Sequence, residues 1–309
     1  MLPPSQHKTI AGLLFQGCAE MEEPLAVKHI LTAVYLHNYT TQPGVRDIAM
    51  LFPKSDILKY QKTLEKLASK GDPEALTLQG LFAERNGQTA QARALYEKAL
   101  EPKWVWQYVP GGRHPAQLPI MHPWNALGYL LQADQNPSVQ AQAKSYFSQG
   151  ANKADDPLSY YELSKFHDRS SEEWLRCISK AAASGFQEAQ LELARFYRDI
   201  APKDSTLLQS DQSGALKKAL NWLLGWRADS AIRLAIEWFE TAGKNGHKLA
   251  MLELANLYES LGEKENAQDQ LRRIVAEIPK LEAGTGTMPE KWPEVVNEAK
   301  RRLAGVRMK

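Results

Sequence analysis

The chain has 309 residues, of which 43% are apolar and 24% are charged, and its formal net charge is +2. This is the composition of a globular protein, and so small a net charge is no argument for binding nucleic acid or an anionic membrane. Its two cysteines argue against a secreted disulfide framework and favour a reducing compartment.

The first 54 residues are predicted to form an N-terminal helical region. Helices are expected near 5–20 and 24–38, with Pro24 in the first turn of the second one, and a further helix near 55–70. The opening residues lack the features of a secretory signal and of an Arg-rich transit peptide. No apolar run approaches the roughly 20 residues of a membrane-spanning helix. We therefore expect an intracellular protein, cytoplasmic or, if a presequence has been removed, mitochondrial.

Residues 55–278 contain a repeated pattern of small residues. Segment 242–250 reads Ala-Gly-x-x-Gly-x-x-x-Ala, and 181–189 and 67–75 repeat the central glycine and final alanine at the same spacing. A Leu-Ala-x-x-Tyr sequence then follows at 193–197 and at 254–258. Offsets of three and four residues place such residues on one face of a helix, where small side chains allow two helices to approach closely. The pattern predicts helix–turn–helix units.

The glycines of this pattern have their own structural meaning. Gly71, Gly185 and Gly246 each fall just past the expected end of a helix. Helices often end on a residue with left-handed backbone angles, and glycine adopts these angles without steric cost. We expect all three glycines to end a helix in this way.

The pattern resembles the Sel1-like repeat, a relative of the tetratricopeptide repeat, with its halves Ala-x-x-x-Leu-Gly-x-x-Tyr and Ala-x-x-Trp-Tyr-x-x-Ala-Ala-x-x-Gly. The best matches are 235–258 and 181–197, and about five units fit between residues 56 and 275. Gln79 departs from the pattern, since leucine is expected there. The resemblance implies an all-α fold, a right-handed α-solenoid in which the first helix of each unit lines the concave face. Members of this family act mostly as adaptors or assembly factors.

Two insertions and a C-terminal segment interrupt or end the array. The first insertion, at about 101–123, contains five prolines and two tryptophans, Trp104 and Trp106, followed by Arg113. It is either a recognition loop or a plug that covers apolar surface. The second insertion, at about 199–230, is expected to contain an amphipathic helix at 213–226 that packs on the array or contacts a partner or a membrane. Residues 279–309 are predicted to be a linker and a helix at 290–305 that caps the last repeat.

The sequence contains no recognisable catalytic arrangement. The seven histidines lack metal-ligand spacing, and there is no glycine-rich phosphate loop and no nucleophile motif. We therefore expect no enzyme activity, no cofactor and no metal ion.

Candidate binding residues follow from the resemblance, by register along the first helix of each unit. Together they would form a mildly basic, aromatic groove, although lysine and arginine are also common on any exposed helix. The candidates are Tyr129, Tyr161, Lys165, Arg195, Arg198 and Asn256, with Trp104, Trp106 and Arg113 of the first insertion as a second set.

The function predicted from these features is that of a non-catalytic scaffold or adaptor. Its concave face would bind another protein, through an acidic or extended peptide segment, in the assembly of a larger complex. The alternative is an organellar RNA-binding repeat protein. The basic C-terminal end favours that alternative, with Lys300, Arg301, Arg302, Arg307 and Lys309.

Overall fold

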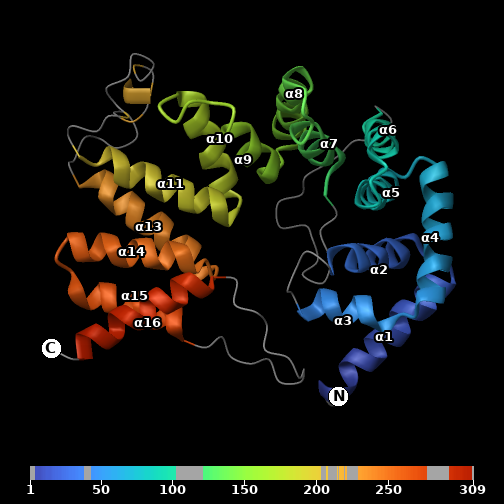
Figure 1. Ribbon diagram of the computed structural model, residues 1–309, viewed down its shortest axis with the longest axis horizontal. Helices are drawn as coiled ribbons and strands as arrows, with labels where there is room; N and C mark the ends of the chain where they lie inside the picture. Colours follow the sequence, from blue (N-terminus) through green and yellow to red (C-terminus); the bar gives the residue numbers. More distant parts are fainter. Residues whose placement is uncertain are drawn as a thin grey trace. The chain divides into compact units, whose positions relative to one another are not determined.

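The computed structural model describes residues 4–37, 43–101, 121–202, 229–276 and 292–307, and within the second insertion residues 207, 214, 216–218 and 220. Within these ranges the secondary structure is helical, as Figure 1 shows. Helices that are neighbours in the sequence pack against each other in pairs, so the predicted all-α fold of solenoid type is confirmed. The chain divides into two compact units, Met1–Asp155 and Asp156–Lys309, which are described separately.

The first unit begins with four helices, α1 (Pro4–Glu20), α2 (Pro24–Leu36), α3 (Pro43–Leu51) and α4 (Lys54–Ser69). Three of them match the helices expected near 5–20, 24–38 and 55–70. The short helix α3 was not predicted, because its Pro-Gly start has the composition of a turn. In the structure Pro43 opens the helix, and Val45 is buried.

Two helix pairs complete the first unit. They are α5 (Pro73–Arg85) with α6 (Thr89–Ala99), and α7 (Pro123–Gln132) with α8 (Pro137–Ala154). Proline occupies the start of α5, α7 and α8, where its missing N–H costs nothing. Most of the first insertion, residues 102–120, lies outside the described residues.

The second unit contains α9 (Pro157–Ser164), α10 (Glu172–Ala183), α11 (Gln187–Ile200), α13 (Ser230–Lys244), α14 (Lys248–Ser260), α15 (Lys264–Val275) and α16 (Pro293–Arg307). The helix pairs are α9 with α10, α11 with α13, and α14 with α15. Of the helix predicted at 213–226, residues 214, 216–218 and 220 are helical, and Leu216 and Leu220 are buried. Its remaining residues, Trp222 and Trp226 among them, lie outside the described residues.

The glycines of the repeat pattern end helices as predicted. Gly71, Gly185 and Gly246 have φ angles of +87°, +88° and +88°. At the last of these turns the Gly246 N–H donates to the Gly243 carbonyl at 3.0 Å, and the next N–H, of His247, donates to the Ala242 carbonyl at 3.1 Å. These two bonds satisfy carbonyls that the end of a helix leaves open. The prediction of left-handed glycine ends is confirmed.

Small residues on the first helix of each pair bring the second helix close. A Cβ atom added to Gly80 of α5 would lie 2.3 Å from Cε1 of Tyr96 on α6, and one added to Gly128 of α7 would lie 2.3 Å from Cζ of Phe147 on α8. Ala194 occupies the corresponding position of α11 and is fully buried. The repeated small residues therefore act through packing.

The C-terminal helix α16 packs against α14 and α15, as expected of a cap. Ala299 is fully buried and Val295 nearly so. Just before the helix, the ring of Trp292 lies 5.0 Å from the ring of His247 at the start of α14. The cap therefore covers the last repeat from the start of α14 along its length.

Candidate functional site

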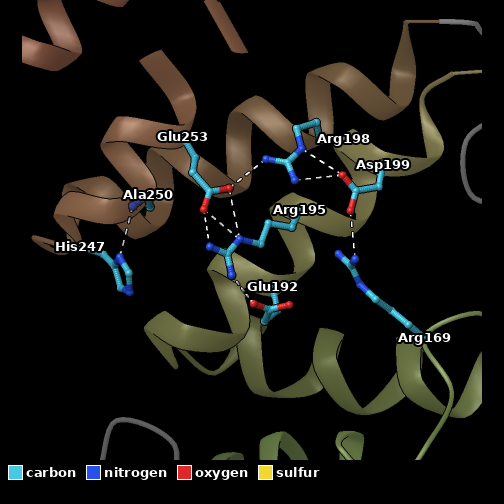
Figure 2. A network of polar contacts seen from close by, with 8 residues as sticks. All are labelled: Arg169, Glu192, Arg195, Arg198, Asp199, His247, Ala250 and Glu253. Atoms are coloured by element: carbon cyan, nitrogen blue, oxygen red, sulfur yellow. Dashed lines mark hydrogen bonds and ion pairs between the residues drawn. The ribbon is translucent and has the colours of Figure 1, made fainter. Parts of the chain in front are cut away.

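The predicted site residues Arg195 and Arg198 lie on α11 and both bind Glu253 on α14 (Figure 2). Arg195 Nε donates to Glu253 Oε1 at 2.9 Å, and Arg198 Nη1 donates to Glu253 Oε2 at 2.9 Å. The Glu253 side chain is 13% exposed, so water competes little for its oxygens. Two arginines of one repeat therefore hold the first helix of the next repeat.

The network continues along α11 and into the loop that precedes α10. Arg195 Nη1 donates to Glu192 Oε1 at 2.6 Å, and Arg198 Nε donates to Asp199 Oδ1 at 3.0 Å. The other oxygen of Asp199 accepts a bond from Arg169 Nη1 at 2.9 Å. Three guanidinium groups thus meet three carboxylates, Glu253 included, and the formal charges cancel (Figure 2). The hydrogen bond with Glu253 raises the pKa of Arg195, which stays charged throughout the physiological range.

The predicted groove is not basic at Arg195 and Arg198, because carboxylates pair with both arginines. Register along the helices predicts the cations of this face but not the acids that neutralise them. The sequence does contain a pattern that indicates these acids, since Leu-Glu-Leu-Ala occurs at 191–194 and again at 252–255. The glutamate therefore recurs in register, two residues before the small residue of the crossing, at Glu192 and at Glu253.

Tyr161 and Lys165 form a second cluster, on α9 and at its end. Lys165 Nζ lies 4.4 Å from the centre of the Tyr161 ring and 2.7 Å from Glu162 Oε1. The Tyr161 ring is 4.9 Å from the ring of Phe186, which precedes α11. Burial raises the pKa of the Tyr161 hydroxyl. The structure thus brings these two predicted residues together, and it attaches them to the next repeat.

Asn256 lies on α14, at the register position that Lys165 and Arg195 occupy in the two repeats before it. Its Oδ1 accepts a hydrogen bond from Arg302 Nη1 of the cap at 2.7 Å, and Arg302 also forms an ion pair with Glu259. Asn256 and Arg198 both line a cavity of 510 Å³ in the second unit. Two of the predicted residues therefore share a concave surface.

The remaining candidates lie elsewhere. Tyr129 is on α7 in the first unit, where its ring packs edge-on against Phe147 at 5.6 Å. The candidate set is thus divided between the two units. Trp104, Trp106 and Arg113 of the first insertion lie outside the described residues.

Among the described residues, no group of three or more histidine, cysteine, aspartate or glutamate side chains is arranged to hold a metal ion. In the same part of the chain, no helix combines the length and the apolar character needed to cross a bilayer.

Comparison with known proteins gives matches among solved structures. No protein-family model matches the sequence, and no curated protein matches it. The chain is similar to a Sel1 repeat protein from Oxalobacter formigenes, with 18% identity over 90% of this chain and 98% of that one, at a TM-score of 0.48. It is also similar to "Assembly Chaperone of RpL4 (Acl4) (Residues 1-338)", with 16% identity over 87% and 98% of the two chains, at a TM-score of 0.30. A Sel1 repeat protein is thus among the solved structures that this helical-repeat chain resembles.

Proposed function

We propose that the chain is a non-catalytic scaffold or adaptor that takes part in assembling a larger complex. It binds a partner protein through the face formed by the first helices α9, α11 and α14 of the second unit, which we call the first-helix face. The observation that carries this proposal is the network around Glu253, which links α11 to α14 by hydrogen bonds within the chain. A surface that is already held in place loses little conformational entropy on binding, which favours recognition of an extended partner segment.

The same network supports the absence of catalysis. General acid–base chemistry needs a carboxylate whose proton can move to or from a substrate. The carboxylates Glu192, Asp199 and Glu253 each accept hydrogen bonds from arginine instead. Their chemistry is therefore that of structural ion pairs.

Protein is favoured over RNA as the partner by the arrangement of the basic C-terminal end. RNA-binding helical repeats use free cations to reach phosphates. Here Arg301 pairs with Glu298 at 2.6 Å, and Arg302 pairs with Glu259. These two cations are engaged within the chain. A salt titration of RNA binding tests this, because phosphate contacts would give a steep loss of affinity with salt.

The test of the proposed function is a pull-down from native extract followed by mass spectrometry, with the whole chain as bait. Lys165→Glu reverses a half-exposed charge on the first-helix face. Arg176→Glu reverses an exposed charge on the second helix of the same repeat and is the matched control. We expect the wild-type chain and the control to recover the same partner, and Lys165→Glu to recover much less. Equal recovery by all three baits, or no partner above background, would contradict the proposal.

A further inference from the structure

The cavity on the second unit lies among the end of α11, the start of α13 and α14. Its volume of 510 Å³ falls within the usual range for sites that take a small molecule or a side chain. One part of its lining is apolar and the other part is polar. The described residues that line it are Ala201, Pro202, Ile232 and Leu257, with Arg198, Glu253, Asn256 and Ser260.

The two charged groups among these described lining residues, Arg198 and Glu253, are already paired. Glu253 accepts hydrogen bonds on both carboxylate oxygens, and Arg198 donates to Glu253 and to Asp199. An acidic occupant would have to compete with Glu253 for Arg198, and a basic occupant would have to compete with Arg198 for Glu253. The cavity therefore fits a neutral group.

Asn256 supplies a hydrogen-bond donor with a fixed direction. Arginine can only donate, so the bond from Arg302 identifies the Asn256 atom that accepts it as the amide oxygen. The amide nitrogen Nδ2 then points away from Arg302, with two N–H groups that bond no other described residue. Asn256 is exposed, so a ligand can reach these donors.

We propose that the cavity receives one apolar side chain, of leucine or methionine size, from an extended segment of the partner, and that Asn256 Nδ2 donates to a main-chain carbonyl of that segment. The apolar lining favours such a side chain over a polar one. The segment is extended because a helix uses its own carbonyls internally, whereas an extended chain leaves them free. This inference rests on the proposed function and specifies its ligand chemistry.

Arg302 of the cap acts in this scheme through Asn256 and is a positioning residue. Removing its side chain allows the Asn256 amide to rotate and to offer either its oxygen or its nitrogen to the ligand. Lysine at position 302 can still donate to Asn256 Oδ1, so a lysine variant keeps the orientation. Arg302→Ala should therefore weaken binding, and Arg302→Lys should restore most of the affinity.

The first test uses a phage-displayed library of random peptides, panned against the whole chain. We expect the enriched peptides to share one apolar residue and to lack a common acidic motif. Affinity for a labelled, enriched peptide is then measured by fluorescence polarisation. Ser260→Phe fills the cavity from an exposed position at the end of α14. Ser184→Phe changes an exposed serine at the end of α10 and is the matched control, since both hydroxyls donate to a carbonyl of the preceding turn.

We expect Ser260→Phe to weaken peptide binding at least tenfold and Ser184→Phe to leave it unchanged. Asn256→Asp keeps the acceptor for Arg302 but removes both donors, and the loss of one hydrogen bond should weaken binding about tenfold. Unchanged affinity in Ser260→Phe, enrichment of acidic peptides alone, or no enrichment would overturn the inference. The pull-down with Lys165→Glu is independent of these outcomes. Partner recovery that depends on Lys165 but not on the cavity would retain the proposed function and reject this inference alone.

Discussion

The close crossing of α5 and α6 gives the sharpest test of the repeat packing. A Cβ atom at Gly80 would lie 2.3 Å from Tyr96 Cε1 and 2.6 Å from its Cδ1, whereas carbon atoms in contact normally stay about 3.5–4.0 Å apart. The Tyr96 ring is fully buried, and its hydroxyl donates to Glu84 Oε2 at 2.8 Å, so it cannot move away freely. Gly80→Ala therefore forces the two helices apart.

The magnitude follows from two opposing terms. Overpacking of this kind costs about 1–3 kcal/mol, and replacing a helical glycine with alanine returns about 0.8–1.0 kcal/mol. Gly17→Ala on α1 is the control, because a Cβ atom there would meet nothing within 4 Å. The control should gain stability, so the two variants should differ by about 1–3 kcal/mol, the overpacking term alone.

The assay is urea denaturation followed by circular dichroism, with hydrogen exchange of α5 and α6 as a local reporter. We expect Gly80→Ala to lower the transition midpoint and to speed exchange in these two helices. Equal shifts of the midpoint in Gly80→Ala and Gly17→Ala would refute the close crossing, and with it the packing role assigned to the small residues.

Three further predictions concern other parts of the fold. Ala194→Leu and Ala250→Leu each place a larger side chain at a fully buried site and should lower the unfolding free energy by about 1–3 kcal/mol, measured by urea denaturation. Burial lowers the pKa of His29 below its ordinary value of 6.5, so its contribution to stability is complete above that pH. It is lost as the pH falls towards the folded-state pKa, because the unfolded chain then binds the proton first. His29→Phe keeps the stacked ring and should lose less stability than wild type on acidification below about pH 6.5, as thermal melts at several pH values would show. Glu253→Gln removes the charge that two arginines share. Because those arginines are partly exposed, we expect the unfolding free energy to fall by about 1–2 kcal/mol, less than the roughly 3–5 kcal/mol of a fully buried pair. Glu237→Gln, at an exposed position on α13, should change the unfolding free energy by less than about 0.5 kcal/mol.

Features of the fold that depend on residues close in sequence could be predicted. The turns at Gly71, Gly185 and Gly246 follow from backbone sterics at a single residue, and the helix pairs follow from the spacing of small and large residues. Helix α3 was missed because its Pro-Gly start satisfies the rules for a turn and for a helix equally well. Local rules do not decide between these two outcomes.

The candidate site was harder to predict because its properties depend on pairs of residues from different helices. Register placed Arg195 and Arg198 on a common face, and the structure agrees with this placement. The net charge of that face also depends on Glu253, which lies 58 residues from Arg195 in sequence. A single helix shows which residues share a face, but the partners across that face are known only when the neighbouring helix is placed.

The ion pairs also indicate how the array ends at α16. Within the array, Arg195 and Arg198 of α11 donate to an acceptor on the next first helix, Glu253. At the corresponding positions of α14 stand Asn256, which accepts a hydrogen bond from Arg302 of the cap, and Glu259, which forms an ion pair with the same arginine. The direction of donation is therefore reversed at the last repeat.

This reversal has a consequence for what can follow α14. A further repeat with a glutamate in the register of Glu253 would bring that glutamate close to Glu259, and two like charges at short range repel. Arg302 of α16 instead donates a hydrogen bond to Asn256 and forms an ion pair with Glu259. The C-terminal segment thus meets the last repeat through polar contacts of Arg302 as well as through the buried Ala299. Because the same arginine orients Asn256, the end of the array and the proposed peptide site depend on one side chain.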